Sequence, residues 1–137
     1  MQVRGFFSTL KFPIVVFIIH LFLFYFNFYL IFPWLDIPMH FLGGFSIALS
    51  YTSFLFNMHV KKLAHLRKDL FFLFVISFVA LTAMLWEFLE FGLDISLNLN
   101  SQMGLVDTIL DMFLGLAGGV TYIFLIKNRK AVQGQFI

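Results

Sequence analysis

Acidic side chains and one histidine recur in pairs at the ends of very apolar stretches of this chain. The pairs are Asp36 and His40, Glu87 and Glu90, and Asp107 and Asp111. Residues three or four positions apart share one face of a helix, so the two members of each pair would point the same way. Carboxylates with a histidine are ligands for divalent cations, and they also transfer protons in acid–base catalysis.

The elements that must position these pairs are predicted to be membrane helices. Of the 137 residues, 61% are hydrophobic and 12% are charged, whereas about 25% are charged in a soluble domain. A helix crosses a bilayer with about 20 mostly apolar residues, and four stretches qualify, at about 12–32, 37–56, 70–91 and 106–126. We therefore expect an all-α integral membrane protein, with a bundle of four transmembrane helices in a single domain over residues 1–137.

The basic residues predict the orientation of this bundle. All nine precede the first stretch, separate the second from the third, or follow the fourth: Arg4, Lys11, Lys61, Lys62, Arg67, Lys68, Lys127, Arg129 and Lys130. Loops rich in Lys and Arg stay in the cytoplasm. The pattern predicts a multi-pass protein of the cytoplasmic (inner) membrane with both termini inside.

The three pairs also agree in depth. Counted from the nearest charged residue on the basic side, His40, Glu87 and Asp111 lie about 31, 27 and 24 Å along their helices. Because the hydrocarbon core is about 30 Å thick, all three pairs fall at or just beneath its outer boundary. Small residues continue each acidic stripe toward the membrane centre: Gly43, Gly44, Ala80, Ala83, Gly115, Gly118 and Gly119. Small residues mark close helix contacts in membranes, so the stripes are expected to meet and bring the acids together.

The acidic residues near the outer boundary need a positive counter-charge, and the sequence places no Lys or Arg at that depth. An ionised Asp near the centre of a membrane helix costs about 3 kcal/mol, which leaves shared protons, water or a bound cation to stabilise the cluster. Without cysteine there is no thiolate site. Mg, Ca and Mn suit an oxygen-rich set, Fe occurs in related carboxylate bundles, and Zn favours more nitrogen or sulfur. The sequence predicts a metal site, without deciding among these ions, formed by Asp36, His40, Glu87, Glu90, Asp107 and Asp111. As structural alternatives, Glu87, Glu90 and Asp111 would be protonated and hydrogen-bonded between helices, and Asp36 and Asp107 would cap their helices.

Three segments carry a resemblance to a known family. "DIPMHFLGGF" (36–45), "WEFLEF" (86–91) and "VDTILDMFLGLAGG" (106–119) resemble the signatures of the YjdF-like inner-membrane family, in the same order along residues 36–125. More distantly, the arrangement is similar to the VanZ-like family of glycopeptide-resistance proteins. The resemblance marks the same six residues as the site. It implies a membrane fold and no particular reaction. The chain departs from the pattern in having one helix ahead of these segments and a short loop after the second.

Two functions are compatible with these features. The first is a membrane-embedded metal or acid–base site that acts on a lipid or another apolar molecule, with His40 as a ligand or general base. The second is an accessory or structural subunit that packs against other membrane subunits or against itself. A cation or proton transporter is disfavoured because no acidic residue leads from the layer to the cytoplasmic side. Nothing indicates a nucleic-acid partner.

Three other residues receive structural interpretations. His20 is predicted to make a hydrogen bond between helices, since a lone histidine on an apolar helix is more often structural than a ligand. Trp86 is assigned to the outer aromatic belt of the membrane. Asp94 is placed in the loop after the third span.

Overall fold

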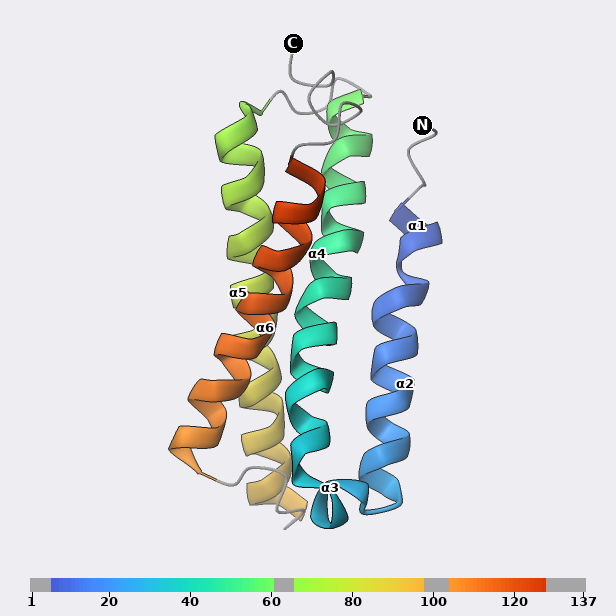
Figure 1. Ribbon diagram of the computed structural model, residues 1–137, viewed down its shortest axis with the longest axis vertical. Helices are drawn as coiled ribbons and strands as arrows, with labels where there is room; N and C mark the ends of the chain where they lie inside the picture. Colours follow the sequence, from blue (N-terminus) through green and yellow to red (C-terminus); the bar gives the residue numbers. More distant parts are fainter. Residues whose placement is uncertain (1–5, 61–65, 98–103, 128–137) are drawn as a thin grey trace.

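Every element in the described part of the chain is helical. The structure is a computed structural model that describes residues 6–60, 66–97 and 104–127. Its elements are α1 (Phe6–Thr9), α2 (Lys11–Tyr25), α3 (Phe28–Ile31), the 3-10 helix η1 (Pro33–Leu35), α4 (Asp36–Val60), α5 (Lys68–Leu97) and α6 (Leu105–Lys127). The longer helices α2, α4, α5 and α6 run alongside one another in alternating directions (Figure 1).

Three helical segments are long and apolar enough to cross a membrane: Pro33–Met58, Lys68–Leu97 and Leu105–Lys127. The helix Lys11–Tyr25 is apolar but shorter. The all-helical membrane class is thus confirmed, with these three candidate spans and one shorter apolar helix.

The first predicted span is not one continuous helix. α2 ends at Tyr25, Asn27 adopts a positive φ of 56°, and the chain continues as the short helices α3 and η1. Asparagine is one of the few residues besides glycine that enter the left-handed region readily. The prediction of an unbroken helix over 12–32 is therefore wrong, because one polar residue with this backbone freedom ends the helix inside an apolar run.

The other three predicted spans lie within α4, α5 and α6, but α5 continues past residue 91 to Leu97. Asp94 therefore belongs to a helix and not to a loop, contrary to the sequence interpretation. No proline interrupts this segment, and a single internal glycine such as Gly92 costs a helix only about 1 kcal/mol.

The two ends of the bundle differ in charge. Lys11 begins α2, Lys68 begins α5 and Lys127 ends α6, and these three helix ends lie at the same end of the bundle (Figure 1). Most of the acidic residues lie toward the opposite end. Five basic residues fall outside the described ranges: Arg4, Lys61, Lys62, Arg129 and Lys130. The side of the membrane that each end faces stays a prediction.

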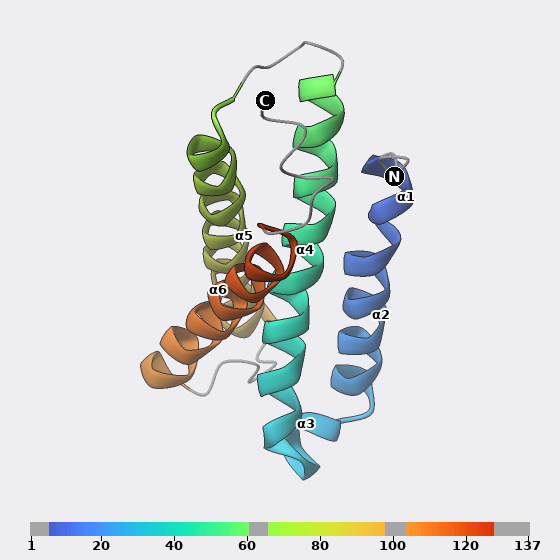
Figure 2. The same cartoon turned by 45° about the horizontal axis from the view of Figure 1, so that its top comes forward.

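The contact between α4 and α6 is the most extensive in the fold, and glycines allow it. A Cβ built at Gly44 would overlap the carbonyl oxygen of Gly115, and one at Gly118 would overlap that of Phe41. Figure 2 shows α6 inclined across α4. Small residues let two membrane helices approach this closely, so these glycines determine how the acidic ends of α4 and α6 meet.

The apolar core occupies the half of the bundle nearer the basic end. It is formed by Ala48, Leu55, Phe56, Phe71, Val75, Val79, Ile123 and Ile126 of α4, α5 and α6. The buried acidic residues Glu87, Glu90 and Asp111 lie in the opposite half of the same helices.

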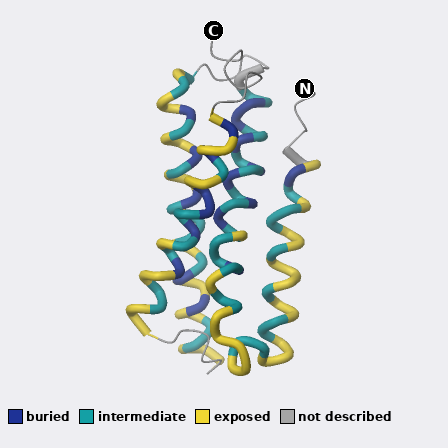
Figure 3. Tube along the Cα trace, in the orientation of Figure 1, coloured by how far each residue is buried: buried dark blue, intermediate teal, exposed yellow. Residues whose placement is uncertain are grey.

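The helix α2 is less buried than the other long helices α4, α5 and α6. None of its side chains is buried (Figure 3). Pro13 has no N–H to donate to the carbonyl of Thr9, the usual partner four residues earlier. The Ser50 hydroxyl of α4 donates to this buried carbonyl instead, at 2.9 Å. Since Thr9 ends α1, shortly before α2 begins, this hydrogen bond attaches the chain at that point to the middle of α4.

Candidate metal centre

The helices α4, α5 and α6 bring five of the six predicted ligands together. Asp36 and His40 lie in the first turns of α4, and Asp111 lies in the second turn of α6. Glu87 and Glu90 lie on the buried side of α5, toward its end. Because neighbouring helices alternate in direction, the start of α4, the end of α5 and the start of α6 share one end of the bundle.

The distances among these side chains suit a bound cation. His40 Nε2 lies 3.3 Å from Asp36 Oδ1 and 3.8 Å from Asp111 Oδ1. Asp36, His40 and Asp111 each offer a ligand atom within 4.8 Å of the others, and so do His40, Glu87 and Glu90. Two oxygens bound to one Ca²⁺ lie at most about 5 Å apart, given bonds of about 2.5 Å. Each group is therefore small enough to surround one ion, and His40 belongs to both.

Burial makes the negative charges of this cluster costly to stabilise. Only 2% of the surface of Glu87, 8% of Glu90 and 5% of Asp111 is exposed. Among the described residues, Arg67 forms an ion pair with Asp69. This pair lies at the opposite end of α5 from Glu87 and Glu90, so it does not neutralise the cluster. Four carboxylates around one imidazole carry excess negative charge in a medium of low dielectric, where like charges repel strongly. A bound divalent cation or shared protons would relieve this repulsion.

Asp107 is the predicted ligand that the structure does not bring into either group. It lies one helical turn before Asp111 and is only partly buried, and neither set of close ligand atoms includes it. Its role as a ligand stays a prediction.

Trp86 contributes to the site in a way that the sequence interpretation missed. Its indole N–H donates a 2.9 Å hydrogen bond to Glu90 Oε1, so it orients one of the candidate ligands in addition to occupying the end of the bundle. The signal was present in the sequence, because Trp86 and Glu90 are four residues apart and therefore share a helix face.

His20 of α2 packs against Trp86 of α5. The hydroxyl of Tyr29 in α3 lies 2.8 Å from His20 Nδ1. His20 therefore has a hydrogen-bond partner, but that partner lies in the same predicted span, 12–32, and not on another span. The His20 and Trp86 rings meet at about a right angle with 5.1 Å between centroids, and the Phe17 and Trp86 rings do so at 5.9 Å. α2 therefore packs onto the tryptophan that holds Glu90.

The comparison with protein families decides the membership of the chain. The family described as predicted membrane protein (DUF2238) matches it over residues 5–131. The chain belongs to this family. No curated protein and no solved structure matches the chain, and the resemblance to the YjdF-like and VanZ-like families stays a prediction.

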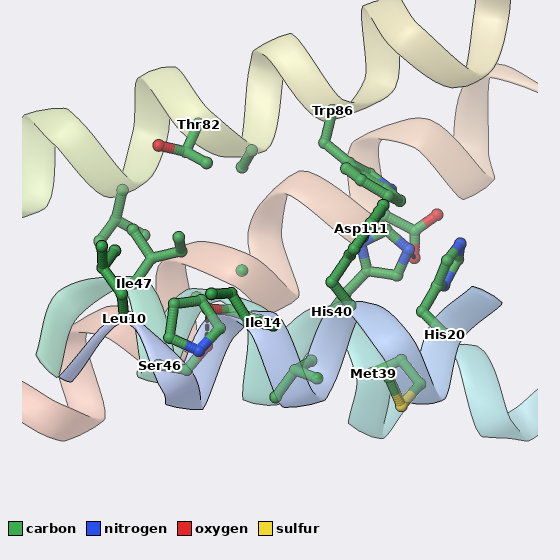
Figure 4. Close-up of a pocket in the computed structure, with 18 residues that line it drawn as sticks. Leu10, Ile14, His20, Met39, His40, Ser46, Ile47, Thr82, Trp86 and Asp111 are labelled. Carbon is green, nitrogen blue, oxygen red and sulfur yellow. Dashed lines mark hydrogen bonds and ion pairs between the residues drawn. The ribbon is translucent and has the colours of Figure 1, made fainter. Parts of the chain in front are cut away.

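This DUF2238 protein has a cavity of about 400 Å³ beside the cluster. Figure 4 shows His40, Asp111, Trp86 and His20 gathered toward one end of it. The cavity is lined by residues of α2, α4 and α5, together with Asp111 and Gly115 of α6 and Leu10 before α2. The cluster is thus reached from an apolar space inside the bundle.

Replacing Trp86 by phenylalanine tests the hydrogen bond to Glu90. Trp86→Phe keeps an aromatic ring for His20 and Phe17 but removes the N–H that orients Glu90. Loss of such a supporting bond lowers metal affinity about 10-fold or more, and we expect that decrease in a Mn²⁺ titration followed by calorimetry. Phe88→Leu, on the exposed side of α5, is the control. Equal Mn²⁺ affinity in Trp86→Phe and wild type would contradict the prediction.

Proposed function

We propose that the protein binds a divalent cation in the membrane through Asp36, His40, Glu87, Glu90 and Asp111. In this proposal the bound ion acts on a lipid or another apolar molecule that reaches it from the bilayer. The observation that carries the proposal is the convergence of two ligand groups, each within 4.8 Å, from three helices onto one shared histidine. Ionisable residues inside membranes are otherwise rare and mark functional sites.

The proposed topology has four crossings, with both termini in the cytoplasm and the cluster near the outer surface. α1 and α2 together cover residues 6–25, apart from Leu10. At 1.5 Å per residue this segment is about 30 Å long, which is the thickness of the hydrocarbon core. The basic residues at the ends of α2, α5 and α6 support a cytoplasmic location for that end of the bundle.

The ligand chemistry favours a hard cation. Four of the five side chains offer carboxylate oxygens and one offers an imidazole nitrogen, a set that suits Mg²⁺, Ca²⁺ or Mn²⁺ better than Zn²⁺. Such an ion polarises phosphoryl or carbonyl oxygens. His40, between Asp36 and Asp111, serves as a ligand or as a general base in this proposal.

The metal content of the purified protein tests the proposal. The protein is purified in mild detergent without chelator, and its metals are measured by elemental mass spectrometry beside Glu87→Gln and Asp94→Asn. We expect about one divalent ion per wild-type chain, a clear loss in Glu87→Gln, and wild-type content in Asp94→Asn. Asp94 is a matched control because it lies on the same helix, outside both ligand groups. Absence of metal from the wild type, both as purified and after dialysis against Mn²⁺, would overturn the cation site.

The exposure of α2 favours a second candidate, an accessory subunit of a larger membrane complex. Within α2 no side chain is buried, and Ile14, Ile18 and Phe22 are each more than half exposed. A partner helix would cover this surface as well as lipid would. Purification of the chain from its native membrane, followed by mass spectrometry of the complex, distinguishes the two. A monodisperse chain without partner proteins would count against this candidate.

A further inference from the structure

The cavity beside the cluster lies between two helices that touch at one end. α2 packs mainly against α4, whereas α5 packs against α4 and α6. α2 and α5 approach each other where Phe17 and His20 meet Trp86. The volume of about 400 Å³ is in the range of pockets that bind small molecules, about 300–1,000 Å³. The space below Trp86 is therefore large enough for a bound molecule.

The lining of this cavity is apolar along most of its length. The apolar lining residues include Leu10, Ile14, Met39, Ile47, Val79 and Ala83. Ser46 and Thr82 also line it, but their hydroxyls donate to the backbone of their own helices, at Gly43 and Phe78. The ionisable lining groups lie at the end of the cavity near His40 and Asp111 (Figure 4).

The length of the cavity equals about half the thickness of the hydrocarbon core of a membrane. Along α2, the lining residues run from Leu10 to His20, which is about 15 Å at the rise of an α-helix. Half of the hydrocarbon core of a bilayer is also about 15 Å thick. Ile14 and Phe17, which line the cavity, are 52% and 44% exposed, so these walls offer apolar surface to a hydrocarbon chain.

We infer that the cavity binds one hydrocarbon chain of an anionic amphiphile, whose phosphate or carboxylate head group lies at the His40–Asp111 end. No Lys or Arg is among the residues that line the cavity, so the bare carboxylates would repel an anion. A divalent ion at the cluster reverses this, because it accepts phosphate or carboxylate oxygens as further ligands. The head-group assignment thus rests on the proposed function, whereas the hydrocarbon-chain assignment rests on the cavity alone.

Gly43 provides a variant that adds a side chain to the cavity. Gly43 lines the cavity, and a Cβ built on it meets no atom within 4 Å. Gly43→Leu should therefore occupy the space that the chain needs. Gly92→Leu is the matched control, since Gly92 is also a helical glycine whose Cβ would meet nothing within 4 Å, and it is not part of the cavity. Circular dichroism and gel filtration verify that both variants keep the fold.

Photo-crosslinking tests the chain assignment. The probe is phosphatidic acid with a diazirine midway along one acyl chain, added with Mn²⁺, and labelled peptides are located by mass spectrometry. We expect label on α2 and α4 around Ile14 and Ile47 in the wild type and in Gly92→Leu. In Gly43→Leu this label should fall about 10-fold or more, while label on the exposed face of α6 stays constant. Equal cavity labelling in Gly43→Leu and wild type would overturn the inference.

Two further probes test the head group and separate this inference from the proposed function. A fatty acid and a diacylglycerol carry the same diazirine chain with a carboxylate and with no charge, respectively. We expect Mn²⁺ to increase cavity labelling by the phosphatidic acid, the fatty acid or both, but not by the diacylglycerol. A larger Mn²⁺ effect on one anionic probe identifies phosphate or carboxylate as the head group. Equal labelling by all three probes in a protein that contains metal would overturn the head-group assignment and leave the cation site standing. A protein without metal would overturn the cation site and, with it, the anionic head group.

Discussion

Gly44→Ala is expected to destabilise the protein more than any other single methyl group added to α4. The new Cβ would overlap the carbonyl oxygen of Gly115 and approach its carbonyl carbon to 2.5 Å. Because the obstacle is backbone and not a flexible side chain, α4 and α6 must separate to accommodate it. Overpacking of this kind costs about 3 kcal/mol, which corresponds to a fall of roughly 10 °C in the melting temperature. Thermal unfolding in detergent, followed by circular dichroism, measures this change.

Gly43→Ala is the matched control for this prediction. It makes the same chemical change one residue earlier in α4, where the added Cβ meets nothing within 4 Å. Since alanine favours a helix over glycine by about 1 kcal/mol, this variant should be as stable as the wild type or slightly more stable. If Gly44→Ala melted at the same temperature as Gly43→Ala, the close contact of α4 with α6 would be wrong.

His40→Ala is expected to weaken cation binding more than the loss of any other single side chain in the cluster. His40 contributes to both ligand groups, whereas each carboxylate belongs to one. Its ring also lies between Asp36 and Asp111, so its removal brings unshielded like charges together. Loss of an outer-shell partner lowers metal affinity by 10- to 100-fold, and loss of this shared ligand should lower it by about 100-fold or more. Calorimetric titration of chelator-treated protein with Mn²⁺ measures the effect.

His20→Ala makes the same substitution at a histidine outside both ligand groups. His20 belongs to neither ligand group and packs against Trp86 and Tyr29, so its loss should change Mn²⁺ affinity by a few-fold at most. Wild-type affinity in His40→Ala, or an equal loss in both variants, would contradict the assignment of His40 as the shared ligand.

The predictions for Gly44 and His40 concern the same interface between α4 and α6. Gly44 and Gly115 allow α4 and α6 to meet closely, and His40 and Asp111 each lie four residues earlier in the same helices. Residues four apart share a helix face, so the glycine contact and the contact between His40 and Asp111 belong to the same interface. A variant that separates the helices at Gly44 should therefore also lower cation affinity, and the same titration measures this second effect.

Much of the candidate site follows from the sequence because its information is local. Spacing within one helix places Asp36 beside His40 and Glu87 beside Glu90, since the period of the α-helix is constant. The constant rise per residue of an α-helix places the three pairs of acidic residues and histidine at one depth in the bilayer, because the bilayer has a defined thickness. The helical membrane class follows in the same way from the length and apolar character of the segments, and three of the four predicted spans lie inside observed helices.

The remaining features depend on how helices that are distant in sequence meet. Asn27 ends the first apolar helix early through its backbone conformation, which hydropathy does not register. The membership of His40 in two ligand groups, the absence of Asp107 from both, and the contact of His20 with Trp86 follow from the crossing of α4 with α6 and from the position of α2. The cavity that α2, α4 and α5 line also joins residues that are distant in sequence, as does the hydrogen bond from Ser50 to the carbonyl of Thr9. Residue spacing along one helix cannot specify such contacts, because each of them is a relation between side chains of different helices.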